Sequence, residues 1–358
     1  MEVNDTNLLL KYRKAIMGVA ALLVYIGHVW EPVFGKVPVI SFVEYFIKLT
    51  GFVGVDFFFF LSGIGLLFAI QKYEIADFYK RRIKRVYIPF LITALAMLMI
   101  NHWTWDEFFR NVSGWNFLFK NIYSLLWFVP AIMIFYIIFP VYYKGFHAAD
   151  NKCQFTALIL TVWLLLSVLL SNTMREDLYG FTNRIPVFVI GVLFGWLIQQ
   201  QKLRFTGLTW ALCIVTWLLG ICFAFKTIFQ GYFLVVPTSN CCIPNLLIAT
   251  SGSFLLAKIF SVIDMWIGNF GRLVVRLFEL FGMISLEFYC VQEWIGGIIL
   301  NKLRGHHRAI TINAAVFIGV LVSTLVLYAI CKLFERILRK EKVVLTTQNE
   351  QSFSNQQT

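Results

Sequence analysis

The chain has 358 residues, of which 59% are hydrophobic and 14% are charged, and its net charge is +12. Soluble domains carry about 25% charged and about 45–50% apolar residues, so this composition excludes an ordinary soluble protein. The positive charge does not point to a nucleic-acid partner, because membrane proteins concentrate Lys and Arg in their cytoplasmic loops. Long continuous apolar runs exclude a β-barrel, so we predict an all-α integral membrane protein in contact with lipids.

A membrane-spanning helix needs roughly 20 mainly apolar residues, and we predict ten such segments. They are residues 15–34, 51–70, 86–100, 122–143, 153–170, 185–198, 207–225, 243–263, 278–300 and 311–334. Most Lys and Arg residues fall on the side of the N-terminus, which predicts that both termini are cytoplasmic. We therefore expect one membrane-embedded domain, 1–345, followed by a polar, disordered cytoplasmic tail, 346–358.

His28 lies near the end of the first apolar segment, 13 residues after Ala15. At 1.5 Å per residue it is about 20 Å along the helix, in the outer half of the membrane for this orientation. An imidazole titrates near pH 6.5 and can act as a general base. The alternative is a hydrogen-bonded histidine at the membrane interface.

Asp56 interrupts the apolar run GFVGVDFFFFLSGIGLLFAI, five residues into the second segment. That segment runs back inward, so Asp56 is predicted at a depth similar to that of His28. A buried carboxylate can orient an imidazole and stabilise its protonated form. The alternative is an acid that interacts with the positive end of a helix dipole.

A basic cluster, Lys80 to Arg85, precedes the third segment. Arg82 and Arg85 are one helical turn apart and are expected to share a face, where they could bind a phosphate-rich ligand. The alternative is simple retention of positive charge on the cytoplasmic side. The chain has no Walker A or dinucleotide-binding motif, so ATP and NAD are not expected and no permanently bound cofactor is predicted.

Three further polar or aromatic residues stand in or beside apolar runs, and each is a candidate substrate contact: Trp127, Arg184 and Glu287. Ionisable groups at membrane depth usually face a cavity or a partner, and Glu287 could pair with Arg184. The sequence GVLFG, from Gly191 to Gly195, has the spacing of close helix packing. The seven cysteines contain no CxxC pair, so neither a disulfide framework nor a metal site is predicted.

The order of these motifs resembles the acyltransferase-3 family of integral membrane acyltransferases. The resemblance covers roughly residues 10–335. It rests on the first segment ending at His28, followed in order by GFVGVDFFFFLSGIGL, FYKRRIKRVYIPF, LWFVPAIMIFYIIFP, NRIPVFVIGVLFG and SLEFYCVQEW.

The resemblance implies a ten-helix fold that transfers an acyl group, often acetyl, from cytosolic acyl-CoA. The implied acceptor is a hydroxyl of a cell-surface glycan or another exported compound, at a bacterial cell membrane. By position, His28 would be the family's essential histidine and Asp56 the acid of its GVD motif. Arg82 and Arg85 would meet the CoA donor, with acetyl-CoA as the expected co-substrate.

Two positions depart from the family pattern. The family commonly has an arginine where this chain has Met17, and Arg13 or Lys14, about one turn earlier, could replace it in direction. The SLE segment often continues to a histidine where this chain has Gln292. Glutamine keeps hydrogen bonding but does not titrate.

Two other classes of function also fit the residues. A transporter or flippase would use polar groups at both membrane faces, although no internal repeat is visible in the sequence. A non-enzymatic scaffold would have little need for acids at membrane depth. Turnover of acyl-CoA separates the enzyme from both alternatives.

Overall fold

The computed structural model describes residues 7–35, 37–101, 103–120, 126–170, 178–231 and 242–354, with side chains up to residue 337. Within these residues the chain is helical and contains no strand. The predicted all-α fold class is thereby confirmed. Cys241 and the first residues of the segment predicted at 122–143 lie outside the described part.

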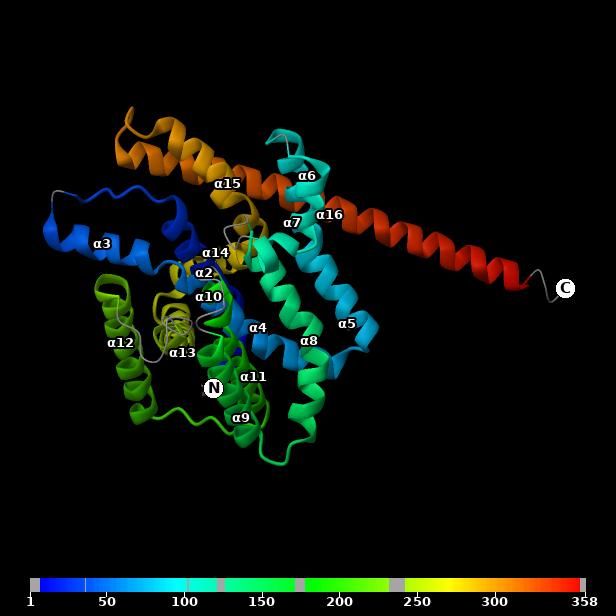
Figure 1. Cartoon of the computed structure of the whole chain (residues 1–358), viewed down its shortest axis with the longest axis horizontal. Coiled ribbons are helices and arrows are strands. Elements are labelled where there is room, and N and C mark those ends of the chain that lie inside the picture. Colours follow the sequence, from blue (N-terminus) through cyan, green and yellow to red (C-terminus); the bar gives the residue numbers. More distant parts are fainter. Residues whose placement is uncertain are drawn as a thin grey trace.

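Figure 1 shows the helices coloured in chain order. In order they are α1 Leu8–Lys11, α2 Arg13–Val29, α3 Pro38–Thr50, α4 Val53–Lys72, α5 Ile75–Arg82, η2 Ile83–Tyr87, α6 Ile88–Ile100, α7 Trp105–Val112, η3 Asn116–Lys120, α8 Phe128–Ala148, α9 Lys152–Leu169, α10 Tyr179–Thr182, α11 Ile185–Gln199, α12 Gly207–Gln230, α13 Cys242–Trp266, α14 Gly268–Met283, α15 Ser285–Leu303 and α16 Ala309–Ser354. Both η elements are single turns of π-helix.

Eight helical stretches in the described part of the chain are long and apolar enough to cross a membrane. One of them, Ile75–Ile100, joins α5, η2 and α6, and another, Tyr179–Gln199, joins α10 and α11. Of the ten predicted spans, the first corresponds to α2, which has only 17 residues. The ninth, 278–300, is interrupted at Ile284 between α14 and α15, and its larger part belongs to α15, which carries Glu287, Glu293 and Lys302. Both helices pack against other helices, so neither needs the length or apolarity of a lipid-facing span.

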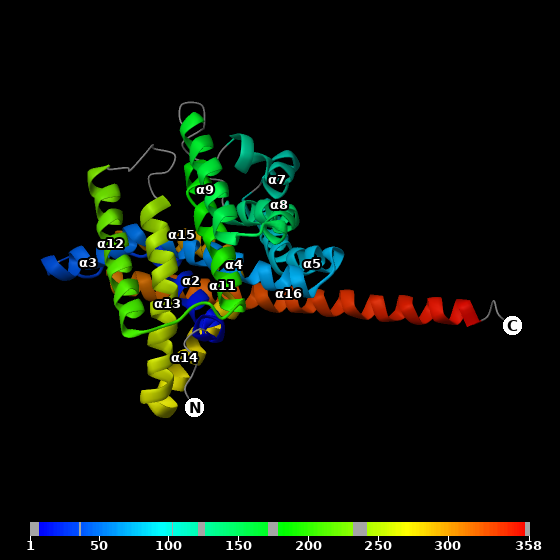
Figure 2. The same ribbon diagram turned by 90° about the horizontal axis from the view of Figure 1, so that it is seen from below.

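Helices α2 and α4 lie in the middle of the bundle in two perpendicular views (Figures 1 and 2). Helix α4 meets α11 backbone to backbone, because Gly63 faces the Phe188 carbonyl and Gly191 faces the Phe60 carbonyl. A Cβ at Gly195 would lie 3.1 Å from the Cα of Ile64. The close packing predicted from GVLFG is therefore confirmed, and it brings the Asp56 helix against the Arg184 helix.

Local sequence signals explain several helix ends. Thr104 and Glu107 form a capping box at the start of α7, and the Asn151 side chain accepts two backbone N–H groups at the start of α9. Gly231 ends α12 with a φ of +61°, a conformation that glycine adopts without strain.

The last helix, α16, runs past one side of the bundle and projects beyond it (Figure 2). The sequence predicts disorder for residues 346–354, but α16 includes them. No proline occurs within α16 to end the helix earlier. Residues 355–358 of the predicted tail lie outside the described residues.

Candidate active site

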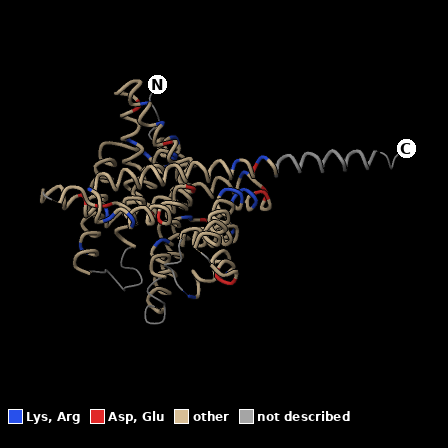
Figure 3. Tube along the Cα trace, turned by 90° about the horizontal axis from the view of Figure 1, so that it is seen from above, with Lys and Arg blue, Asp and Glu red and all other residues tan. Residues whose placement is uncertain are grey.

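A cavity of about 420 Å³ opens between α2, α4, α8, the basic segment at α5 and η2, and the corner where α14 meets α15. Its polar lining is strongly basic: Arg13, Lys14, Arg82, Arg85 and Lys332. Lys and Arg are concentrated at this end of the bundle, where the basic segment lies beside α16 (Figure 3). A cavity with this charge is suited to an anionic ligand that carries several phosphates.

Arg82 is the last residue of α5, and its guanidinium lies 5.4 Å from the centre of the Phe78 ring and 5.7 Å from that of Tyr136. Its Nε is buried without a hydrogen-bond partner. The aromatic rings hold the side chain at the cavity wall by cation–π attraction, and among the described residues its Nε remains free to donate. Arg82 thus has the freedom that the predicted phosphate contact requires.

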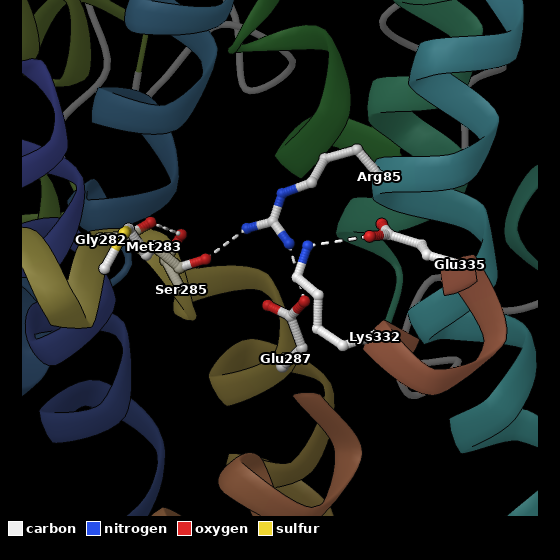
Figure 4. Close-up of polar contacts among 7 residues, drawn as sticks. All are labelled: Arg85, Gly282, Met283, Ser285, Glu287, Lys332 and Glu335. Atoms are coloured by element: carbon white, nitrogen blue, oxygen red, sulfur yellow. Dashed lines mark hydrogen bonds and ion pairs between the residues drawn. The ribbon is translucent and has the colours of Figure 1, made fainter. Parts of the chain in front are cut away.

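Arg85 lies in the π-helical turn η2 and is committed to protein partners (Figure 4). Its Nη1 donates to Oε1 of Glu287 at 2.7 Å, and its Nη2 donates to the Met283 carbonyl at 2.6 Å. The Glu287 side chain is only 2% exposed. The predicted pairing of Glu287 with Arg184 is therefore wrong: Glu287 binds Arg85 and joins the basic segment to α15.

Lys332 reaches the same region from α16 and pairs with Glu335 at 2.8 Å (Figure 4). Sequence reasoning missed this residue. Its only sequence signal is a lysine one turn before an acid at the end of an apolar helix, which is also typical of membrane anchoring. Only the packing of α16 against α6 and α15 shows that Lys332 borders the cavity.

The junction of α1 and α2 positions the other two basic residues. The Tyr12 hydroxyl donates to Asp264 of α13 at 2.9 Å, and Lys11 donates to both groups, at 2.7 Å and 3.1 Å. The hydrogen bond to Tyr12 is the main cause that raises the pKa of Lys11, although burial opposes it. With α2 fixed here, Arg13 and Lys14 line the cavity one turn before Met17. Either residue can therefore supply the positive charge that an arginine at the position of Met17 would supply in the family.

Arg13 crosses to α4, where its Nη2 donates to the Leu61 carbonyl at 3.1 Å. The guanidinium lies over Gly65, and a Cβ at that position would be 2.5 Å from Nη2. The absent side chain of Gly65 therefore makes room for Arg13.

We expect Gly65→Ala to displace the Arg13 guanidinium and to weaken binding of a phosphate-bearing ligand. Loss of one hydrogen bond to a charged group predicts a dissociation constant for CoA about tenfold higher, measured by isothermal calorimetry in detergent. Gly297→Ala is the matched control, because a Cβ there meets nothing within 4 Å. Equal affinity in the two variants would contradict the role of Arg13.

His28 lies in the last turn of α2 and is exposed. Its Nδ1 is 3.5 Å from Nε2 of Gln292, which is 1% exposed on α15. The nearest cavity-lining residue on that helix, Tyr289, is one turn before Gln292. Helix α15 therefore connects the basic cavity with the predicted general base.

The chain after His28 is held by α3. One carboxylate, that of Glu44, accepts the Trp30 indole N–H at 2.8 Å and the backbone N–H groups of Val33 and Phe34 at 2.8–2.9 Å. Lys48 donates to the Trp30 carbonyl at 2.7 Å. These contacts fix the segment that begins two residues after His28.

Glu44 predicts a pH-dependent stability. Burial raises the pKa of its carboxyl, but the hydrogen bonds from Phe34, Trp30 and Val33 together outweigh burial and hold that pKa below the ordinary 4.5. Its stabilisation is therefore present above the unfolded-state pKa and is lost as the pH falls through the folded-state pKa. We expect Glu44→Gln to lower the melting temperature at pH 7, with a difference that shrinks below pH 4.5. Glu74, which is exposed and whose side chain does not cap α5, serves as the control when replaced by Gln.

Asp56 is fully buried, and its Oδ1 lies 3.5 Å from Nε of Arg184. Asn245 of α13 also faces this carboxylate. Arg184 further contacts the Gly180 and Phe52 carbonyls and lies 5.1 Å from the centre of the Trp127 ring. Trp127 and Arg184, both predicted as substrate contacts, therefore meet each other.

Asp56 makes no hydrogen bond to His28 in the part of the chain that the structure describes. The contact partner of His28 is Gln292 instead. The predicted contact of Asp56 with His28 is therefore not formed, because α4 turns its acid toward Arg184 at the start of α11 and Asn245 of α13.

A family model described as an acyltransferase domain, that of the acyltransferase-3 family, matches residues 15–332. This chain belongs to the acyltransferase-3 family. The match runs from the first turn of α2 to Lys332, so it includes His28, Asp56 and the cavity lining except Arg13 and Lys14. No match was found among curated proteins or solved structures.

The chain is accordingly an acyltransferase, and its apolar helices make it a multi-pass membrane protein. Membership favours the enzyme over the transporter and scaffold alternatives. Both departures from the acyltransferase-3 pattern fall beside candidate site residues. Met17 lines the basic cavity together with Arg13 and Lys14, and Gln292 contacts His28.

Proposed function

We propose that this acyltransferase moves an acetyl group from acetyl-CoA to a hydroxyl of a cell-surface glycan or another exported acceptor. The basic cavity is the observation that carries the proposal, because CoA presents a pyrophosphate and a further phosphate to its protein. In the proposed bacterial cell membrane, the cavity faces the cytosol, where the donor is made. Both termini then lie on the cytosolic side, as the distribution of Lys and Arg favours.

The basic residues divide into two groups in the proposed donor site. Arg13, Lys14, Arg82 and Lys332 bind phosphate oxygens by charge-assisted hydrogen bonds. Arg85 stays with Glu287 and Met283 and holds α15 in place. The thioester end of the donor extends along α15, past Tyr289, toward His28.

His28 acts as the general base in the proposed transfer. Its imidazole takes the proton of the acceptor hydroxyl while the oxygen attacks the thioester carbonyl. The C–S bond then breaks, and the imidazolium returns the proton to the leaving sulfur, so that CoA departs as the thiol. The exposed position of His28 at the end of α2 leaves room for a bulky acceptor to approach. The Asp56–Arg184 pair joins α4 to the start of α11 and so supports the helices around this centre.

The test is release of free thiol from acetyl-CoA by the purified protein, with lipid-linked glycans as candidate acceptors. We expect acceptor-dependent release, and a KM for acetyl-CoA raised about tenfold or more in Arg82→Gln through loss of a charge-assisted hydrogen bond. Arg81→Gln is the matched control, because Arg81 lies over the Tyr73 ring, 3.9 Å from its centre, and does not line the cavity. Failure of CoA to bind or to protect the protein against thermal unfolding would overturn the donor assignment.

A further inference from the structure

The contact between α2 and α15 beside His28 contains buried polar atoms that have no hydrogen-bond partner among the residues that the structure describes. Gln292 is 1% exposed, yet its Oε1 has no hydrogen-bond partner, and its Nε2 lies 3.5 Å from Nδ1 of His28. The buried hydroxyl of Tyr25, one turn before His28, also lacks a partner, and the Tyr25 ring packs against Phe288, one turn before Gln292. Apolar residues would pack between two helices without this cost, so the polar groups indicate a functional requirement.

The direction of the Gln292 amide decides what the imidazole can do. If Nε2 of Gln292 donates to Nδ1, the neutral ring carries its proton on its own Nε2 and has no free lone pair for a base. The oxygen and nitrogen of a glutamine amide are interchangeable by rotation. With Oε1 turned toward the ring, Nδ1–H donates to it, and the imidazole Nε2 is left unprotonated on the exposed side of the ring.

We propose that Gln292 is the positioning residue for His28: its Oε1 accepts Nδ1–H and thereby selects the tautomer whose Nε2 takes the proton from the acceptor hydroxyl. This inference rests on the proposed role of His28 as general base. It assigns to a neutral amide on α15 the orienting task that a carboxylate performs in other base-catalysed enzymes. Because an amide does not titrate, the orientation holds across the pH range in which the imidazole changes charge.

Other charged groups lie on the elements that pack around this end of α2, and most are engaged elsewhere. Glu31 pairs with Arg304, Glu44 and Lys48 bind the segment after His28, and Asp56 pairs with Arg184. Glu293 is the neighbour of Gln292 on α15. All remain unchanged when only Gln292 is replaced, so a difference between variants reports the contact of residue 292 with the ring.

The first experiment reads the His28 ring without any substrate. Diethyl pyrocarbonate reacts with histidine only when the imidazole is neutral, so its rate of reaction at His28, followed by peptide mass analysis, gives the pH midpoint of the ring. In Gln292→Glu a carboxylate beside the ring stabilises the imidazolium, and we expect the midpoint to rise by about one to two pH units. Glu293→Gln, on the next residue, should leave the midpoint within a few tenths of a unit. An unchanged midpoint in Gln292→Glu would overturn the proposed contact.

The second experiment reads catalysis with a neutral variant of similar volume, which guards against misfolding of a buried glutamate. In Gln292→Met we expect kcat to fall about ten- to a hundredfold, the loss seen when a hydrogen-bond partner of a metal-bound imidazole is removed, with an unchanged KM for acetyl-CoA. In Gln292→Glu the acid limb of kcat/KM should move to higher pH with the ring midpoint. Unchanged kcat in the methionine variant would refute positioning by Gln292. If the ring midpoint shifts but neither the wild type nor any variant releases CoA thiol, the contact of Gln292 with His28 is supported and the proposed acyl transfer is wrong.

Discussion

Replacing His28 by alanine is expected to lower kcat for acyl transfer by about 10²- to 10⁴-fold, the usual contribution of a positioned general base. The donor site is built from other residues, so CoA should still bind with wild-type affinity. The combination of lost turnover and retained binding separates a catalytic role from a structural one. It is measured by thiol release at saturating acetyl-CoA together with calorimetric CoA binding.

His147→Ala provides the matched control. His147 lies near the end of α8, where its ring stacks on Tyr143, and it does not line the basic cavity. This variant should retain wild-type turnover, which excludes a general effect of removing an imidazole. A His28→Ala protein with undiminished kcat would contradict the mechanism. If His28→Ala instead lost CoA binding, His28 would be a residue that binds the donor.

Asp56→Ala is expected to destabilise the protein by about 3–5 kcal/mol, because removal of one partner leaves a buried charge uncompensated. Arg184 is 4% exposed, so water cannot replace the carboxylate. Its contacts with the Gly180 and Phe52 carbonyls and with the Trp127 ring compensate in part, which places the expected loss at the lower end of that range. Denaturant unfolding in a fixed detergent measures the free energy.

The double variant Asp56→Leu/Arg184→Leu tests whether the uncompensated charge of Arg184 causes the loss of stability in Asp56→Ala. With both charges replaced by apolar side chains, no buried charge is left alone, so the double variant should be more stable than Asp56→Ala. An Asp56→Ala protein that is as stable as wild type but inactive would contradict the structural role. That result would show that Asp56 takes part in the reaction, as its match to the acid of the family's GVD motif predicts.

The sequence indicated candidate positions for the site but not the contacts that their side chains make. The acids and the histidine at membrane depth could be singled out as candidates, because a polar group in an apolar run is visible without any structure. Their partners were not visible. Asp56 and Arg184 are 128 residues apart in the chain, and Arg85 and Glu287 are 202 apart. Glu44 gave no signal at all, since an acid in a short amphipathic helix is common.

The sequence by itself determined the class of protein, the family, the order of the apolar helices and the close approach of α4 and α11 at Gly191 and Gly195. These are properties of local composition and spacing, which a linear pattern records. The tertiary structure alone decided that Glu287 holds Arg85, that Lys332 completes the cavity and that Gln292 rather than Asp56 meets His28. The rotation of each helix about its axis selects which side chains face one another, and that rotation is set by the packing of all the helices together.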